Sequence, residues 1–366
     1  MSGARIVIMA GGTGGHVYPA LAVARLLRER GWQVTWMGTE QGLEARVAPA
    51  NGIELDCIRV RGLRGRGLRA WLLLPIRLWA ALRQAGRILR ARRPDVVLGM
   101  GGYAAGPGGI AAALRRIPLV IHEQNAAPGL TNRVLARLAR RVLSGFPDSF
   151  PPARRAEVVG NPVRRELLET PAPESRMGER EGPVRVLILG GSQGARPLNQ
   201  QVPAVLQRLP TDRAQVRHQC GAGREEEAKT AWAGSGVEVS IEPFIEDMRA
   251  AWEWADLAIC RAGALTVSEL AAVGVAAVLV PLPHAADDHQ TRNATWLERA
   301  GAARLVPQER LAQDSFLAVL DELTRDRSLL VDMAVRARAR AFPDADRRVA
   351  DICGELVGPA SREETA

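Results

Sequence analysis

The feature that most constrains this chain is a local design that occurs twice, once in each half. Residues 6–10 form an apolar segment that runs into glycine-rich residues 11–15, and a helical pattern begins near Pro19. Much later, residues 184–189 run in the same way into residues 190–194, again before a helical stretch. A strand, a glycine loop and a helix in this order present backbone N–H groups and the positive end of a helix dipole, which bind anions. The duplication predicts two similar domains, each with an anion-binding loop.

Short apolar segments alternate with helical patterns along both halves. The predicted strands are 34–38, 96–100, 119–122 and 141–144 in the first half, and 216–220, 237–241, 257–260 and 276–281 in the second. Unbroken apolar strands separated by helices are typical of parallel sheets that helices cover on both faces. Residues 170–183, rich in Pro, Gly and charge, are predicted to be a linker. The pattern therefore predicts an α/β protein of two Rossmann-like domains that face each other across a cleft.

Composition and missing motifs argue against two classes of nucleotide-binding enzyme and indicate the compartment. The formal net charge is +9 and Lys229 is the only lysine, so the Gly-Lys-Ser/Thr sequence of a P-loop kinase or ATPase is absent. Neither glycine loop matches GxGxxG, which argues against a dinucleotide-dependent oxidoreductase. The sequence shows neither a signal peptide nor an apolar run of the roughly 18 residues that span a bilayer, so we expect a cytosolic setting. The four cysteines are predicted to be buried small hydrophobes in a reducing compartment: Cys57, Cys220, Cys260 and Cys353.

Polar residues gather where strands are predicted to end. A third glycine-rich stretch, residues 99–109, follows a strand of the first half, and three anion-competent loops indicate more than one phosphate-bearing ligand. In the second half, Thr266 and Ser268 can bind phosphate oxygens and Glu269 can accept ribose hydroxyls; alternatively, Thr266 or Ser268 only caps a helix. Ligands of parallel sheets bind at the carboxyl ends of strands. A sugar nucleotide and a phosphorylated acceptor fit this arrangement.

Taken in order, these motifs resemble the MurG family, which transfers N-acetylglucosamine from UDP-N-acetylglucosamine to lipid I and so makes lipid II for peptidoglycan. The motifs are GGTGGH at 11–16, GGYAAGPGG at 101–109, HEQN at 122–125, GNPVR at 160–164, GGSQGA at 190–195 and RAGALTVSE at 261–269. The resemblance implies an inverting hexosyltransferase of cell-wall synthesis, and thereby of cell shape and division. The alternative is a glycosyltransferase that acts on a different lipid or small-molecule acceptor.

The resemblance also implies the GT-B glycosyltransferase fold. Residues 1–163 would form an acceptor and membrane-side domain, and residues 164–342 would form the domain that binds the UDP-sugar. The C-terminal helix, within residues 343–366, would pack back on the first domain. No cofactor or metal is expected. The one Asp-x-Asp spacing, Asp344 and Asp346, is interpreted as acidic residues that cap a helix and complement its dipole.

The resemblance assigns residues to each substrate. The family's donor contacts fall on Thr13, Gly14, Gly15, Asn125, Arg164, Ser192, Ile245, Ala264, Leu265, Thr266, Val267, Ser268, Glu269 and Gln290. Their chemistry suits this use. Arg164 and Ser192 suit the diphosphate, and Asn125 and Gln290 suit the sugar hydroxyls. Glu269 suits the ribose, and the backbone of Ile245 suits the uracil. The acceptor side falls on Gly101, Gly102 and Tyr103.

An inverting transfer needs a base that takes the proton of the attacking hydroxyl. His16 is the candidate, because it directly follows the first glycine loop; the alternatives are that it binds a phosphate or hydroxyl, or that it caps the following helix. His122 is the rival base. The other interpretation is that His122 is a partly buried structural histidine whose hydrogen bonds are satisfied within the protein. Glu123 is either a base itself or a residue that orients another. The sequence leaves these alternatives open.

Residues 57–94 carry eleven arginines and no acidic residue. Within them Leu78, Leu82, Ala85 and Leu89 share one helical face and are predicted to contact the core. The preceding segment combines cations with an apolar wedge that suits an anionic membrane surface: Arg69, Trp71, Leu72, Leu73 and Leu74. The alternative is an ordinary buried loop. Nucleic acid is not an expected partner, because no aromatic platform accompanies the arginines. We expect a peripheral protein on the cytoplasmic side of the bacterial inner membrane, with other cell-wall synthesis proteins as candidate partners.

Overall fold

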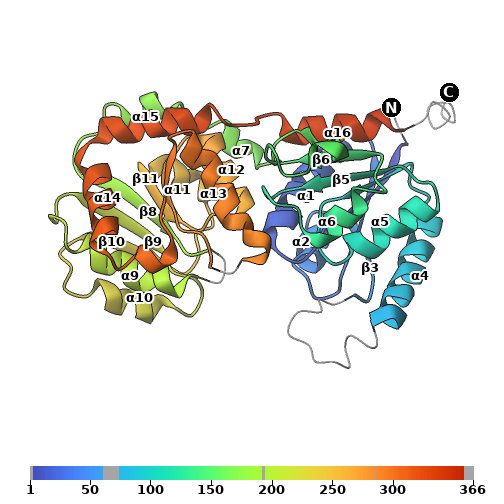
Figure 1. Cartoon of the computed structure of the whole chain (residues 1–366), viewed down its shortest axis with the longest axis horizontal. Coiled ribbons are helices and arrows are strands. Elements are labelled where there is room, and N and C mark those ends of the chain that lie inside the picture. The colour runs from blue at the N-terminus through green and yellow to red at the C-terminus, as the bar shows by residue number, and fades with distance from the viewer. Residues whose placement is uncertain (1–2, 61–73, 192–193, 284, 358–366) are drawn as a thin grey trace. The chain divides into compact units, whose positions relative to one another are not determined.

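The chain forms two compact α/β units, each built on its own sheet (Figure 1). The computed structural model describes residues 3–60, 74–191, 194–283 and 285–357. Unit 1 comprises Met1–Arg164 and Asp344–Ala366, and unit 2 comprises Arg165–Pro343. The α/β class and the two Rossmann-like sheets are confirmed.

Unit 1 holds a seven-stranded sheet in the order β3-β2-β1-β4-β5-β6-β7, and every pairing in it is parallel. Its strands are β1 Arg5–Met9, β2 Gln33–Gly38, β3 Glu54–Cys57, β4 Val96–Gly99, β5 Leu119–Glu123, β6 Arg141–Ser144 and β7 Glu157–Val158. Its helices are α1 Gly14–Glu29, α2 Glu44–Ala50, α4 Leu74–Arg92, α5 Ala105–Leu114, α6 Leu130–Leu135 and α16 Ala345–Glu355, with a short 3₁₀ turn at Pro152–Arg154.

Strand β1 shows why the apolar runs have no polar gaps. Successive residues of a strand point to opposite faces of the sheet. Ile6 and Ile8 pack into a cluster with α1 and α16, whereas Val7 and Met9 pack into a cluster with α4, α5 and α6. Both faces are buried, so every position of the strand must be apolar.

Unit 2 repeats this plan with a six-stranded parallel sheet in the order β10-β9-β8-β11-β12-β13. Its strands are β8 Val184–Leu189, β9 Ala214–Gln219, β10 Glu238–Glu242, β11 Leu257–Cys260, β12 Ala276–Leu279 and β13 Ala303–Leu305. Its helices are α7 Arg165–Leu168, α8 Pro173–Met177, α9 Arg196–Leu206, α10 Glu225–Trp232, α11 Met248–Trp254, α12 Ala264–Val273, α13 His289–Arg299, α14 Asp314–Arg325 and α15 Arg327–Arg338, with 3₁₀ turns at Ala286–Asp288 and Gln308–Arg310.

Both sheets reverse their strand order at one internal point. Counted within each unit, six strands follow the order 3-2-1-4-5-6, so the chain leaves the first strand toward one edge and later returns on its other side. The reversal lies between β1 and β4 in unit 1, and between β8 and β11 in unit 2. Parallel sheets bind ligands at the carboxyl ends of strands beside such a switch point. Each glycine loop of the duplicated design therefore lies at the switch point of its own sheet.

Three strands were not predicted, and all three lie at sheet edges. They are β3, β7 and β13. An edge strand is less covered than a central one, so its sequence carries less of the apolar signal; β3, for example, reads Glu-Leu-Asp-Cys. Cys57 ends this strand and is exposed, which corrects the expectation that all four cysteines are buried; the other three are.

The predicted linker at residues 170–183 is wrong, because this segment packs on unit 2. It contains the short helix α8, whose Pro173 and Met177 are buried. The Arg176 guanidinium donates to the carbonyls of Val273 and Gly274 at the end of α12. Proline and charge therefore marked a folded segment that is held by side-chain bonds to backbone carbonyls.

Helix α4 only partly follows its predicted face. Ala85 and Leu89 are buried, but Leu78 near the start of the helix is 40% exposed. Of the predicted membrane segment, Arg69, Trp71, Leu72 and Leu73 lie outside the described residues, and Leu74 begins α4. Among the described helices, none combines the length and the hydropathy that a transmembrane crossing needs.

Candidate active site

The first glycine loop lies over a buried carboxylate. Glu44, in the first turn of α2, is fully buried, and its Oε2 accepts the Gly12 N–H at 3.0 Å. Its Oε1 accepts from the backbone N–H and the hydroxyl of Thr39, at 2.9 and 2.7 Å. One amide of the predicted anion loop is therefore bound to the protein's own carboxylate. Glu44 lies outside every glycine motif, so no sequence signal identified it.

The loops that follow β1 and β4 touch at the switch point of unit 1. A Cβ at Gly102 would lie 2.4 Å from the Gly11 carbonyl oxygen, so only glycine allows this approach. A Cβ at Gly101 would lie 2.7 Å from Nδ1 of His16, which places the imidazole against this loop. The structure thus brings His16 together with Gly101 and Gly102, whereas Tyr103 is 55% exposed. His16 lies within the first turn of α1, after Thr13 as N-cap, so it does not cap the helix itself.

Two side chains continue inward from His16 and end at a backbone carbonyl. His16 Nδ1 lies 2.7 Å from Gln124 Oε1, and Gln124 Nε2 lies 3.1 Å from His122 Nδ1. His122 Nε2 lies 2.8 Å from the Gly160 carbonyl oxygen. His122 is fully buried, and this burial lowers its pKa to about 4. These contacts favour a structural role for His122, as a buried histidine with its hydrogen bonds satisfied, over a role as the catalytic base.

Glu123 is occupied by the loop that it precedes. Its carboxylate accepts four hydrogen bonds: from the N–H and Nδ2 of Asn125 at 2.9 and 3.1 Å, from the Gly129 N–H at 3.2 Å and from Asn132 Nδ2 at 2.9 Å. Only 2% of the residue is exposed. Among the two roles that the sequence left open, this arrangement favours the orienting one, with Asn125 as the residue that Glu123 orients.

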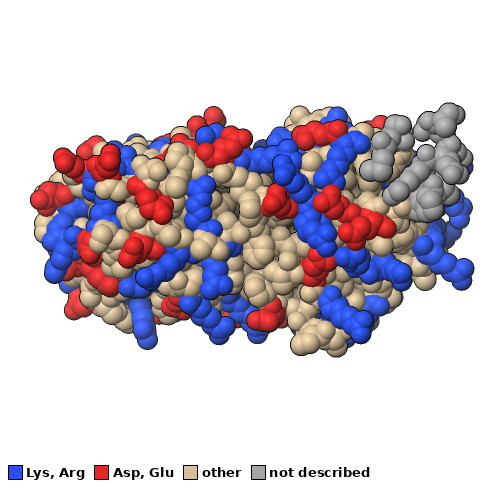
Figure 2. All heavy atoms as spheres, turned by 90° about the horizontal axis from the view of Figure 1, so that it is seen from above, with Lys and Arg blue, Asp and Glu red and all other residues tan. Residues whose placement is uncertain are grey.

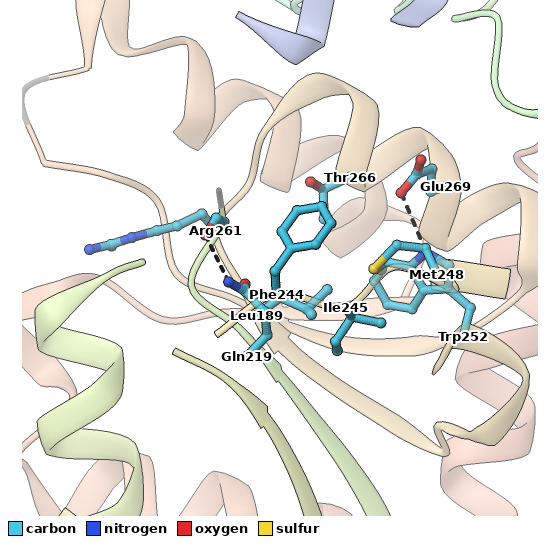
Figure 3. Close-up of a pocket in the computed structure, with 10 residues that line it drawn as sticks. Leu189, Gln219, Phe244, Ile245, Met248, Trp252, Arg261, Thr266 and Glu269 are labelled. Carbon is cyan, nitrogen blue, oxygen red and sulfur yellow. Dashed lines mark hydrogen bonds between the residues drawn. The ribbon is translucent and has the colours of Figure 1, made fainter. Parts of the chain in front are cut away.

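A pocket opens at the switch point of unit 2 (Figure 3). Its lining comes from the ends of β8, β9 and β11, the segment after β10, and helices α11 and α12: Leu189, Gly191, Gln219, Phe244, Ile245, Met248, Trp252, Arg261, Thr266 and Glu269. Ile245, Thr266 and Glu269 were predicted from the sequence. Phe244 was missed, because a single aromatic residue after a strand carries no signal; it is 59% exposed and lines the pocket together with Thr266 (Figure 3).

Helix α12 carries the polar end of this pocket. Its N-cap is Gly263, so Thr266 and Ser268 lie inside the helix and the alternative that one of them caps it is wrong. The Ser268 hydroxyl donates to the Ala264 carbonyl at 2.9 Å. Glu269 is largely buried, and its Oε2 accepts from the indole N–H of Trp252 at 3.3 Å (Figure 3).

Two further polar side chains fix the segments around the pocket. Gln219 Nε2 donates to the carbonyls of Gly191 and Pro243, at 3.1 and 2.9 Å, and so joins the second glycine loop to the segment that carries Phe244. Arg261 donates to backbone carbonyls after β12 and to Gln308 Oε1. Its side chain extends away from Phe244 (Figure 3).

The remaining predicted residues divide between the units. Thr13, Gly14, Gly15, Asn125 and Arg164 belong to unit 1, and Ala264, Leu265, Val267 and Gln290 belong to unit 2. Gln290 Oε1 accepts the Leu282 N–H at 2.9 Å, and Ser192 lies outside the described residues. Asp344 and Asp346 do lie at the start of α16, but the Asp344 side chain makes no capping bond and instead pairs with Arg347.

Comparison with known proteins gives one answer for the whole chain. Residues 6–144 match the glycosyltransferase family 28 N-terminal domain, and residues 185–349 match its C-terminal domain. A relative from Alkalilimnicola ehrlichii, named UDP-N-acetylglucosamine--N-acetylmuramyl-(pentapeptide) pyrophosphoryl-undecaprenol N-acetylglucosamine transferase, is 57% identical over 96% of this chain and 98% of its own length. A relative of the same name from Halorhodospira halophila is 55% identical over 97% of this chain and 99% of its own length.

A solved structure agrees with these relatives. The crystal structure of Acinetobacter baumannii MurG is 40% identical, covers 96% of this chain and 99% of its own, and superposes with a TM-score of 0.85. Family models, relatives and structure all extend over both units and include the loops at both switch points. The chain therefore belongs to glycosyltransferase family 28 and, within it, to the MurG family of N-acetylglucosaminyltransferases.

Proposed function

We propose that the protein transfers N-acetylglucosamine, with inversion, from UDP-N-acetylglucosamine to lipid I and thereby forms lipid II. The observation that carries this proposal is the similarity over nearly the full length to relatives that are named for this reaction. The geometry of the two switch points supports it, because each offers the chemistry that one substrate requires.

The pocket of unit 2 suits the nucleotide. The Phe244 ring provides an aromatic face for a uracil, and the backbone of Ile245 provides its hydrogen-bond partners. Glu269 is placed to accept ribose hydroxyls, and the N-terminal amides of α12, with Thr266 and Ser268, favour the diphosphate. Ser192 and Gln290 complete the donor contacts that we propose for unit 2.

The switch point of unit 1 suits the acceptor and the proton transfer. We assign the acceptor to Gly101, Gly102 and Tyr103, and the base role to His16, which lies against Gly101. The acceptor O–H bond breaks and its proton goes to His16, while the oxygen forms a bond to the anomeric carbon. The bond from that carbon to UDP breaks, and its electron pair leaves on the diphosphate. Cationic Arg164 and backbone N–H groups favour this developing charge. Thr13, Gly14, Gly15 and Asn125 are the further donor contacts that we propose for unit 1.

The test is the release of UDP from UDP-N-acetylglucosamine, with and without a short-chain lipid I analogue, in the presence of EDTA. We expect release that depends on the acceptor. His16→Ala should lower kcat by roughly 10²–10⁴-fold, the typical contribution of a general base. Glu269→Ala should raise the donor KM roughly 10–100-fold, because a hydrogen bond to a charged group is worth about 1.5–3 kcal/mol. Glu322→Gln, at a surface ion pair with Arg304, is the matched control and should change neither constant.

The outcomes distinguish a transferase that uses another acceptor from a protein without transferase activity. Release that occurs with other lipid or small-molecule acceptors but not with lipid I would move the protein to the alternative glycosyltransferase activity. Absence of any acceptor-dependent release, in protein shown to be folded, would overturn the proposal.

We further propose that unit 1 docks peripherally on an anionic membrane surface through the start of α4. There Ile76 and Trp79 are 65% and 58% exposed, and the guanidinium carbon of Arg83 lies 4.4 Å from the centre of the Trp79 ring. Arg77 and Arg87 are also exposed on this helix. Apolar side chains beside cations suit the boundary between lipid headgroups and acyl chains.

This docking predicts binding to vesicles that contain phosphatidylglycerol and much weaker binding to vesicles of phosphatidylcholine alone. Binding should fall as salt rises, because each basic residue near the surface contributes roughly 1 kcal/mol of screened attraction. Trp79→Ala should weaken sedimentation with the anionic vesicles, whereas Leu114→Ala, at a 76% exposed position at the end of α5, controls for the general loss of apolar surface. Equal binding of both variants and the unchanged protein would contradict this use of α4.

A further inference from the structure

We infer that Gln124 is a positioning residue that holds the proton of neutral His16 on Nδ1 and leaves Nε2 as the proton acceptor. The inference rests on the proposed function, in which His16 is the base. It concerns a residue that contacts neither substrate in that proposal. Gln124 is almost completely buried and lies between two imidazoles.

At the inner end of this series of contacts, beside Gly160, only one arrangement of hydrogens is possible. The Gly160 carbonyl oxygen can only accept a hydrogen bond, so the Nε2 of His122, 2.8 Å away, must donate. Complete burial disfavours the charged imidazole and lowers the pKa of His122 to about 4, so the ring is neutral near pH 7. A neutral ring with its proton on Nε2 has an unprotonated Nδ1.

That nitrogen fixes the orientation of the Gln124 amide. The group that lies 3.1 Å from His122 Nδ1 must be a donor, and it is also 3.3 Å from the His122 carbonyl oxygen. The amide NH₂ satisfies both contacts. The reversed amide would place its oxygen against a nitrogen lone pair and a carbonyl oxygen, with no hydrogen between them. The chemistry of the neighbours therefore decides which end of the amide faces His16.

The amide oxygen then determines the tautomer of His16. Gln124 Oε1 lies 2.7 Å from His16 Nδ1 and can only accept, so Nδ1 must carry the proton. In the neutral imidazole Nε2 is consequently unprotonated. Gly101 packs against the Nδ1 and Cε1 atoms, since a Cβ there would lie 2.7 and 2.8 Å from them. One edge of the ring is thus held, and the base presents the nitrogen that can take a proton.

The first test needs no substrate. In protein labelled with ¹⁵N at its five histidines, long-range ¹⁵N–¹H correlations report which nitrogen of each ring carries the proton, and the His16 signal is assigned by its loss in His16→Asn. We expect the Nδ1–H form in the unchanged protein and a mixture of both forms in Gln124→Leu. Gln124→Glu should retain the Nδ1–H form, because one oxygen of the buried, neutral carboxyl group still accepts from His16 while its O–H donates to His122 Nδ1 in place of the amide NH₂. An Nε2–H form in the unchanged protein, or an unaltered signal in Gln124→Leu, would overturn the inference.

The second test measures the consequence for catalysis. Gln124→Leu should lower kcat about tenfold or more, less than the roughly 10²–10⁴-fold of a lost base, with the donor KM within about twofold. Gln124→Glu should recover a large part of kcat. Gln207→Leu is the matched control: its amide donates to the Ala231 carbonyl in unit 2, and kcat should be unchanged.

The two tests also separate this inference from the proposed function. An unchanged kcat in folded Gln124→Leu would contradict the positioning role. A protein without transferase activity would overturn the proposed function, whereas the tautomer of His16 would still decide the role of Gln124. If Gln124→Leu does not fold, the unchanged protein and Gln124→Glu still give the tautomer.

Discussion

At the scale of single residues, Gly101 is the position where one added methyl group has a defined chemical consequence. Its φ is +99°, and an alanine in this backbone conformation would be strained by roughly 1–2 kcal/mol. The new Cβ would also lie 2.7 Å from His16 Nδ1, so the ring must move away from Gln124. We expect Gly101→Ala to lower kcat at least about tenfold and to mix the two His16 tautomers, as measured by steady-state kinetics and ¹⁵N–¹H correlations.

Gly106→Ala is the matched control in the same segment. The nearest heavy atom to its Cβ is Thr131 Cγ2 at 3.6 Å, an ordinary contact, and the residue lies within helix α5. The helix should gain up to about 1 kcal/mol, and the His16 signal should not change. A His16 signal in Gly101→Ala that matches the unchanged protein would contradict the close packing of the two loops.

The sequence located the site residues better than it explained them. His16, His122 and Glu123 all lie in predicted motifs, but their roles depend on contacts between distant segments. The bond from His122 to Gly160 joins residues 38 apart, and that from Gln124 to His16 joins residues 108 apart. Glu44 and Phe244 carry no periodicity or motif at all. Local patterns therefore predict where polar groups gather, whereas tertiary hydrogen bonds decide which of them remain available for chemistry.

At the scale of elements, α16 belongs to unit 1 although the whole of unit 2, Arg165–Pro343, separates it in sequence from the rest of unit 1. Its Val349 and Ile352 are fully buried in the cluster that also contains Ile6 and Ile8. Its rim carries ion pairs, among them Arg30 with Asp351 at 2.6 Å. On the face drawn in Figure 2, acidic and basic side chains are intermingled.

The burial of α16, rather than its ion pairs, should determine how strongly it stabilises unit 1. Ile352→Ala should lower the free energy of unfolding by about 2–5 kcal/mol, because it leaves a cavity in the core. Arg348→Ala, which removes pairs with Glu157 and Glu355, should cost no more than about 1 kcal/mol. Both losses are measured by unfolding each variant in urea, with hydrogen exchange of β1 peptides as the probe of unit 1. Equal losses in the two variants would contradict this ranking.

Burial also explains which elements the sequence predicts. Central strands such as β1, β4 and β8 are covered on both faces and must be apolar throughout, so their runs are visible in the sequence. Three edge strands, β3, β7 and β13, lack one neighbour and lack that signal, whereas the fourth edge strand, β10, was predicted. Segment 170–183 was misjudged because its attachment to unit 2 uses arginine bonds to carbonyls, which composition does not report.

At the scale of the whole molecule, each unit buries one of the histidines that the structure describes, and acid should therefore destabilise both units. Burial lowers the pKa values of His122 in unit 1 and of His218 in unit 2 to about 4. His218 accepts from the Trp232 indole at 3.0 Å, and its Nε2 lies 3.1 Å from Asn199 Oδ1. Neither hydrogen bond needs a charged ring.

The direction of the pH effect follows from proton uptake. In the unfolded chain a histidine has a pKa of about 6.5, so below that pH the unfolded state binds protons that the folded state does not. The stability that each neutral imidazole contributes is complete above about pH 6.5 and is lost as the pH falls toward 4. The free energy of unfolding falls by up to about 1.4 kcal/mol per pH unit for each histidine. Between about pH 6.5 and pH 4, each of the two structural units therefore loses roughly 3 kcal/mol.

Substitution of one histidine should remove this pH dependence from one unit only. In His218→Gln the amide can still accept from Trp232 and donate to Asn199, but it does not titrate. Hydrogen exchange of β8 peptides, corrected for intrinsic rates, should therefore change much less between pH 7 and pH 5 in this variant than in the unchanged protein. Peptides from β1 serve as the internal control, because unit 1 retains His122 and should keep its full response. If β8 peptides of His218→Gln still lose protection as steeply as before, groups other than the buried histidine govern the acid response of unit 2.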